Sequence, residues 1–121
     1  MGAFAAALER AVKRAPEARL AAVMGMDGIT VERVCEESAG EALEGLAAEV
    51  CGLMRKGLAG SDDIGMGPVQ ELVVGAAGAA VVVRGITSEY VLVLALRQGA
   101  LIGRARAAVR LACLELEEQF Q

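Results

Sequence analysis

The sequence predicts an α/β protein of the α+β type: a three-layer α/β/α sandwich built on a five-stranded, mostly antiparallel sheet. Three segments carry apolar residues at helical spacing, and five segments have the β-rich character of strands. The strands are joined by connections short enough for hairpins, which link antiparallel neighbours. The near-continuous apolar run at residues 91–94 indicates a sheet that is buried on both faces. Helices must then cover both faces, in the order α-ββ-α-βββ-α.

The first helix is predicted over residues 3–15, with Pro16 just beyond it as a stop. Its expected apolar face consists of Phe4, Ala7, Leu8, Ala11 and Val12. Residues 19–24 and 29–35 read as two strands, because both are apolar or β-branched in partial alternation. Residues 25–28, Gly-Met-Asp-Gly, supply the turn that makes them a hairpin.

The second helix is the strongest local prediction. Ser38 followed by Glu41 forms a capping box, which satisfies the first free backbone N–H groups of a helix. The apolar positions that recur every three or four residues are Leu43, Leu46, Ala47, Val50, Leu53, Met54, Gly57 and Leu58. We expect this helix to end near Gly60, and residues 61–68 to form a polar, flexible loop.

Three further strands are predicted at residues 69–74, 79–84 and 90–96, which form an antiparallel meander. A final helix follows Gln98 and Gly99. Its expected apolar face consists of Leu101, Ala105, Ala108, Val109, Ala112 and Leu116. We interpret residues 1–121 as a single domain, because this length suits one core and no linker interrupts it.

The composition limits the compartment and the partners. The longest apolar run, residues 76–83, is too short to cross a membrane, and the N-terminus lacks the pattern of a secretion signal. Three cysteines without C-x-x-C spacing predict neither a disulfide framework nor a zinc site, which fits a reducing cytoplasm. Residues 37–71 carry seven acidic residues against Arg55 and Lys56, so nucleic acid is not expected as a partner.

The sequence offers no catalytic site. It contains no histidine, which removes the commonest acid or base at neutral pH. The Gly65–Met66–Gly67 motif lacks the third glycine of a dinucleotide fingerprint, and no P-loop is present. Asp62 and Asp63 lack the further carboxylates of a calcium loop. We therefore expect no enzyme, no cofactor and no bound metal, and we expect the three cysteines, Cys35, Cys51 and Cys113, to be core residues.

Three features of the sequence together resemble the Roadblock/LC7 family. They are the element order, the Met26-Asp27-Gly28-Ile29 hairpin, and the Gly-x-Leu-Ile-Gly-x-x-Arg start of the last helix, Gly99 to Arg106. The resemblance covers nearly the whole chain. It implies a non-enzymatic module that dimerises and serves as a regulator or scaffold for small Ras-like GTPases, as MglB-like proteins do, or as a dynein light chain. The unusually high alanine and glycine content departs from the family pattern.

The resemblance also implies where a homodimer forms, since family members join two sheets through the third strand and pack the two middle helices together. The residues that match these positions are Val69, Glu71, Leu72 and Val73 in the strand and Gly45, Ala48 and Gly52 in the helix. The residues agree with this, because a strand with little charge and a seam of small side chains suit self-association. The alternative is that these residues merely pack against their own sheet.

The charged residues on the second helix either form an ordinary solvated face, the more common case, or contact another partner; the candidates are Glu41, Glu44, Arg55 and Lys56. Arg84 and Arg97, at strand ends, are weaker candidates for an arginine finger supplied to a GTPase. Glu115, Glu117 and Glu118 are expected to form a frayed, solvated helix end. Two alternatives stay open: an adaptor whose binding is independent of nucleotide, and a small-molecule sensor or enzyme.

Overall fold

The computed structural model describes residues 2–36 and 40–120, and only the backbone of residues 58–63. Its elements are α1 (Ala3–Arg14), β1 (Ala18–Gly25), β2 (Thr30–Cys35), α2 (Gly40–Asp63), β3 (Glu71–Gly75), β4 (Ala79–Gly85), β5 (Tyr90–Arg97), α3 (Ile102–Glu117) and the short 3₁₀ helix η2 (Glu118–Phe120). The predicted order α-ββ-α-βββ-α is therefore confirmed.

The five strands form one sheet in the order β2-β1-β5-β4-β3, and every neighbouring pair is antiparallel. The predicted hairpin and meander are thus joined through β1 and β5, which pair along most of their length. This leaves β2 and β3 as the two edge strands. The register of β1 against β2 shifts between Val23 and Met24, because Val31 is an extra residue in β2.

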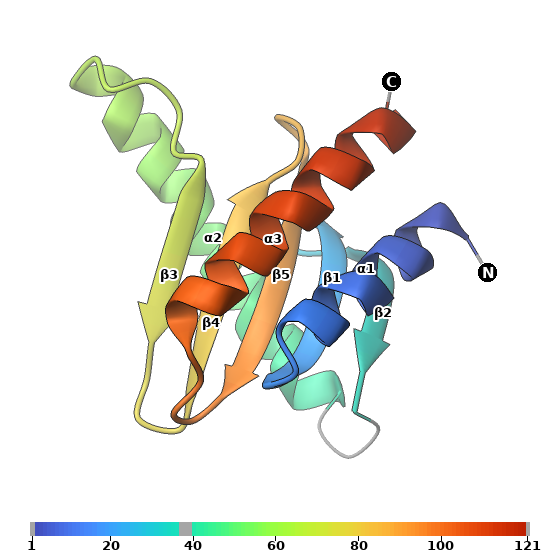
Figure 1. The fold of residues 1–121 in the computed structure, drawn as a ribbon. Coiled ribbons are helices and arrows are strands. Elements are labelled where there is room, and N and C mark those ends of the chain that lie inside the picture. The colour runs from blue at the N-terminus through green and yellow to red at the C-terminus, as the bar shows by residue number, and fades with distance from the viewer. Residues whose placement is uncertain (1, 37–39, 121) are drawn as a thin grey trace.

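Two helical layers cover the sheet, as predicted. Figure 1 shows α1 and α3 side by side across one face and α2 alone across the other. Alternate residues of each strand feed the two cores: in β5, Leu92 and Leu94 pack beneath α1 and α3, whereas Val93 and Ala95 pack beneath α2. All four are completely buried, so β5 reads as an unbroken apolar run because both of its faces are covered.

The end of the second helix was predicted wrongly. The helix continues past Gly60 to Asp63, and Gly65, rather than Gly60, takes the left-handed conformation, with φ of 74°. Glycine permits that conformation but does not demand it, so the spacing alone could not choose between the two positions. The first three positions of the predicted loop, residues 61–63, are thus helical. The capping residue Ser38 lies outside the described part of the chain.

Two smaller predictions also need correction. The third strand begins at Glu71, so Val69 and Gln70 precede it. Leu101, expected on the apolar face of the last helix, instead lies just before Ile102 and is exposed to solvent. A residue at the N-cap position has extended backbone, so its side chain leaves the direction that the helical spacing predicts.

The end of α3 is tied down rather than frayed. Glu115 accepts hydrogen bonds from Arg10, at 2.8 Å, and from Arg14, at 3.2 Å, so it joins α3 to α1. The hydrogen bond from Arg10 lowers the pKa of the Glu115 carboxyl, against the effect of its partial burial. Beyond the helix, Phe120 stacks between Phe4 and Tyr90, with ring centroids 5.2 and 4.7 Å apart.

Candidate functional site

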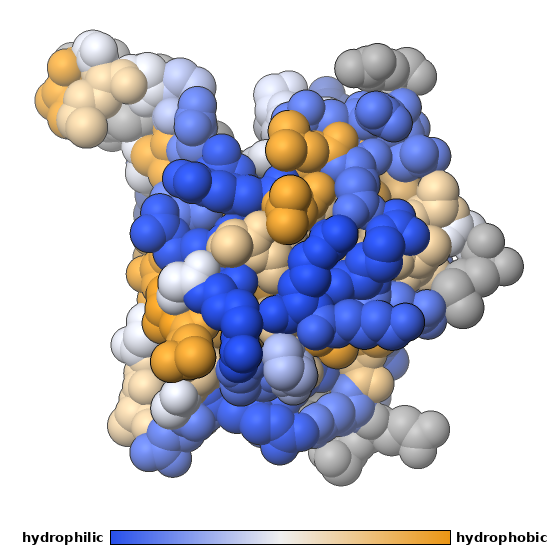
Figure 2. Space-filling view, in the orientation of Figure 1, coloured by the Kyte–Doolittle hydropathy of each residue, from blue (hydrophilic) through white to orange (hydrophobic). Residues whose placement is uncertain are grey.

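The outer edge of β3 is an open strand edge beside α2. Within the part of the chain that the structure describes, β3 pairs with β4 alone, so one side of its backbone has no strand neighbour there. Leu72 and Val74 pack into the core beneath α2, while Val73 points to the other face and is 39% exposed. Figure 2 shows apolar surface along the β3 side of the molecule, at the left of the view. The hydrophilic surface of α1 and α3 lies next to it. An uncovered edge with little charge is a template for another strand.

Glu71 is held inside the chain rather than offered to a partner. Its carboxylate accepts a hydrogen bond from Nε of Arg106 on α3, at 2.7 Å, and lies 3.5 Å from a guanidinium nitrogen of Arg84 on β4. These contacts connect the start of the edge strand to α3 and β4. Among the predicted strand residues, Glu71 therefore positions the edge, and Val73 is the apolar side chain that stays exposed.

The outer face of α2 carries apolar residues that the sequence assigned to the core. Leu43, Ala47, Val50 and Met54 are buried against the sheet as expected, but Leu46 and Leu53 are 36% and 52% exposed. The predicted stripe was too wide for one face, since these two leucines lie on the solvent side of the helix. At 3.6 residues per turn the eight predicted positions cover an arc of about 140°, with Leu46 and Leu53 at one margin, so their spacing alone did not mark them as exposed.

Two glycines, Gly45 and Gly52, directly precede these leucines and lie about 100° around the helix from them. A Cβ atom added to Gly45 or Gly52 would meet no other atom within 4 Å, so both positions point away from the sheet. They stand seven residues apart, or about two helical turns, and therefore form a seam along the helix. Small residues permit another helix to approach closely. We name Gly45, Leu46, Gly52 and Leu53 the α2 outer seam.

Ala48 occupies a different position from the two glycines. It is half-buried and packs toward the core beneath α2, where its Cβ lies near Gly28 in the β1–β2 turn. Val69 also faces this core, because its side chain would lie 3.4 Å from a Cβ on Gly57. The side chains of Ala48 and Val69 thus pack against the core beneath α2.

Of the four charged candidates on α2, one is bound within the chain and three are exposed. Glu44 accepts a hydrogen bond from the Thr30 hydroxyl, at 2.9 Å, and pairs with Arg33, so it fastens α2 to β2. Glu41, Arg55 and Lys56 are exposed, and none forms an ion pair with a residue that the structure describes. Only these three are available to meet a partner.

The two arginine-finger candidates are both engaged. Arg97 pairs with Glu36, which also binds Arg19, and Arg84 lies beside Glu71. Either side chain must leave a carboxylate before it could reach a nucleotide on another protein.

The cysteines have the environment of core residues. Cys51 and Cys113 are buried, and burial raises the pKa of both thiols, that of Cys113 to about 12. Cys35 is half-buried against the core beneath α2. Among the side chains that the structure describes, those of residues 2–36, 40–57 and 64–120, no group of three or more Cys, Asp or Glu is arranged to hold a metal ion. None of the helices described combines the length and apolar character needed to cross a membrane.

The element order, the strand order and the single helix on one face define the Roadblock/LC7 fold. The chain is similar to a Roadblock/LC7 domain from Streptomyces avermitilis, with a TM-score of 0.81 and 17% identity over 94% of each chain. The resemblance drawn from the sequence is therefore confirmed for the fold.

Two other solved structures are also similar. An MglB with a tetrameric arrangement gives a TM-score of 0.82 and 20% identity, over 95% of this chain and 85% of that one. MglC from Myxococcus xanthus gives 0.73 and 25% identity, over 98% of this chain and 99% of that one. Searches with the amino-acid sequence found no matching family model and no matching curated protein.

Proposed function

We propose that this chain is a single-domain, non-catalytic, homodimeric Roadblock-type regulator or scaffold that binds a Ras-like small GTPase in the cytoplasm. The observation that supports it most is that β3 has an open edge with Val73 exposed, and that the neighbouring helix α2 exposes Leu46 and Leu53. An unpaired strand edge and exposed apolar side chains are features of interaction sites. The Roadblock/LC7 fold and the MglB and MglC structures support a regulator or an adaptor over an enzyme.

In the proposed dimer, two copies of β3 pair antiparallel across a two-fold axis and extend the sheet. The same axis packs the two α2 helices antiparallel through their outer seams. Along α2, the midpoint between Glu41 and Lys56 coincides with the midpoint between Gly45 and Gly52. An antiparallel pair centred there places each Gly45 opposite the partner's Gly52 and each Glu41 beside the partner's Lys56. Opposite charges then meet at both ends, whereas a parallel pair would bring like charges together.

The contribution to a GTPase would be positional. The chain has no P-loop of its own, so the nucleotide, its Mg²⁺ and the phosphate-binding lysine belong to the partner. A rigid surface that holds the partner's switch loops can align the attacking water and speed hydrolysis without adding a catalytic group. Among the exposed charges of α2, Arg55 stays outside the proposed Glu41–Lys56 pairs and is the proposed contact with the GTPase.

The dimer is tested by placing one charge on each edge of the sheet. Val73→Lys puts an ammonium group on the β3 edge, and Val31→Lys puts the same group on the opposite edge strand, β2, where Val31 is 48% exposed. We expect Val73→Lys to give monomers and Val31→Lys to stay dimeric in light scattering or sedimentation at micromolar concentration. A wild-type monomer, or equal behaviour of the two variants, contradicts the proposed interface.

GTPase regulation is tested by single-turnover GTP hydrolysis by a Ras-like GTPase that co-purifies from the native cell, with and without this protein. We expect binding that differs between the GTP-bound and GDP-bound partner, and a change in the hydrolysis rate. Binding that is identical for both nucleotides would instead support the structural adaptor. The absence of any GTPase among the co-purified proteins would exclude the leading proposal.

A further inference from the structure

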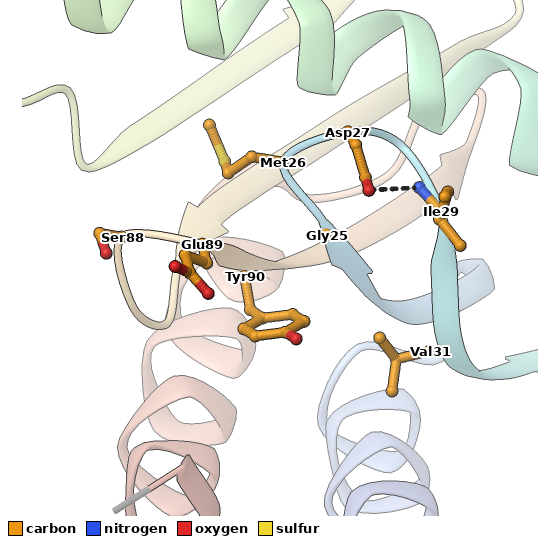
Figure 3. Close-up of a pocket in the computed structure, with 8 residues that line it drawn as sticks. All are labelled: Gly25, Met26, Asp27, Ile29, Val31, Ser88, Glu89 and Tyr90. Atoms are coloured by element: carbon orange, nitrogen blue, oxygen red, sulfur yellow. Dashed lines mark hydrogen bonds between the residues drawn. The ribbon is translucent and has the colours of Figure 1, made fainter.

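A second surface lies at the β2 edge of the sheet, opposite the edge used in the proposed dimer. A hollow of about 420 Å³ opens there between the β1–β2 turn and the β4–β5 turn. Figure 3 shows Tyr90 and Val31 on its two sides, with Asp27 and Ile29 in one turn and Glu89 in the other. Because β3 is at the far edge, a dimer formed through β3 as proposed leaves this hollow open.

The walls of the hollow are held by hydrogen bonds within and between the turns. The backbone N–H of Met26 donates to the Glu89 carbonyl oxygen at 2.9 Å, which joins the two turns directly. The Asp27 carboxylate accepts a hydrogen bond from the backbone N–H of Ile29 at 3.0 Å. The Tyr90 ring is stacked on Phe120. The hollow is therefore preformed, and a partner loses little free energy in ordering it.

The lining combines apolar surface with negative charge. Ile29 and Val31 are 67% and 48% exposed, although both are β-branched aliphatic residues. The carboxylates of Asp27 and Glu89 line the same hollow, and neither forms an ion pair with any residue in the described part of the chain. No lysine or arginine lines it. An apolar side chain accompanied by a positive charge is complementary to this surface.

The shape of β2 indicates how such a partner would bind. Val31 is the extra residue of the β-bulge, which interrupts the regular ladder at the position where the hollow begins. A bulge on an edge strand disfavours the addition of another strand. The partner would therefore insert side chains between the two turns rather than extend the sheet.

We propose that this hollow is a docking site for a protein segment that presents a leucine-like side chain next to a lysine or arginine. The apolar side chain contacts Ile29, Val31 and the Tyr90 ring, and the cation is attracted by the carboxylates of Asp27 and Glu89 in the two turns. This surface is separate from the β3 edge and the α2 outer seam. A dimeric protein would carry one copy of it at each end of the joined sheet and could hold two partner segments at once.

The experiment titrates the full chain with short peptides and follows its backbone amides by NMR. The probe is acetyl-Ser-Leu-Lys-Ser-amide, with acetyl-Ser-Leu-Glu-Ser-amide and acetyl-Ser-Gly-Lys-Ser-amide as matched controls. We expect the first peptide to shift the amides of residues 25–31 and 88–90, and added salt to weaken it. Equal binding of the glutamate peptide, shifts centred elsewhere, or no shifts up to about 10 mM peptide would overturn the proposal.

Two charge-neutral variants test the assigned carboxylates. Asp27→Asn keeps an oxygen that can accept the Ile29 N–H, and combined with Glu89→Gln it removes both charges without removing bulk. We expect this double variant to bind the lysine peptide at least about threefold more weakly. The matched control, Glu9→Gln with Glu49→Gln, removes two exposed charges that lie outside the hollow and should leave the affinity unchanged. Equal affinities of the two double variants would refute the assignment, and neither result depends on the dimer.

Discussion

Replacing Gly28 with alanine should strain the contact that sets the position of α2. Gly28 ends the β1–β2 turn with φ of 85°, a conformation that costs an L-residue about 1–2 kcal/mol. An added Cβ would also lie 3.2 Å from the Cβ of Ala48, so the helix must move by a few tenths of an ångström. Crowding of a packed contact adds about 1 kcal/mol or more. We therefore expect Gly28→Ala to lower the free energy of unfolding by about 2–3 kcal/mol.

Gly99→Ala is the matched control for this prediction. Gly99 has φ of 79°, but a Cβ there would meet no atom within 4 Å, so its variant carries only the backbone strain. Urea unfolding followed by circular dichroism should place Gly28→Ala below Gly99→Ala by about 1 kcal/mol. In the wild type, Ala48→Gly should lower the free energy of unfolding by about 1 kcal/mol, the cost of a glycine within a helix. In the Gly28→Ala protein the loss should be smaller, because Ala48→Gly also removes the Cβ that crowds the new side chain. Equal losses for the two glycine variants, or strictly additive effects of Ala48→Gly, would refute the reasoning.

Three further predictions concern Glu115, Phe120 and Cys113, on the side of the sheet that α1 and α3 cover. Glu115→Gln should reduce stability by at most about 1 kcal/mol near neutral pH, because it weakens the exposed pair with Arg10. The pKa of Glu115 lies below its ordinary value of 4.5. The stability difference between wild type and Glu115→Gln is therefore present above pH 4.5 and is lost as the pH falls through the lowered pKa. Urea unfolding at about pH 7 and about pH 3 measures that difference. Phe120→Ala removes two aromatic stacks and should lower the free energy of unfolding by about 2 kcal/mol in the same assay, whereas Gln119→Ala, which is exposed, should be nearly neutral. The Cys113 thiol, with a pKa of about 12, should resist alkylation at about pH 8 until the protein is unfolded; rapid labelling of the native protein would show that it is accessible.

Much of the fold could be predicted because local and global signals agree. The Asp27-Gly28 turn, the apolar residues 91–94 and the helical spacing of α1 each favour the element that the structure contains. The limits of elements were less certain, since Gly60 and Gly65 offer equivalent sites for ending α2. The helix ends at Asp63, and Gly65 is the residue with the left-handed conformation.

The candidate site was harder to predict from periodicity. A leucine contributes the same signal whether it contacts its own sheet or an absent partner, so Leu46 and Leu53 were assigned to the core with Leu43. Likewise, Glu44 and Glu41 look equivalent in the sequence, yet only Glu44 is engaged by Thr30.

The sequence by itself determined the kinds of elements, their order and the two-sided burial of the sheet, because these follow from local spacing and turn chemistry. The tertiary structure decided which surfaces remain uncovered. Pairing of β1 with β5 brings the hairpin and the meander into one sheet and leaves β3 and β2 at its edges. Both proposed surfaces depend on that long-range pairing, which no local pattern encodes: the apolar β3 edge with α2 beside it, and the acidic hollow beside β2.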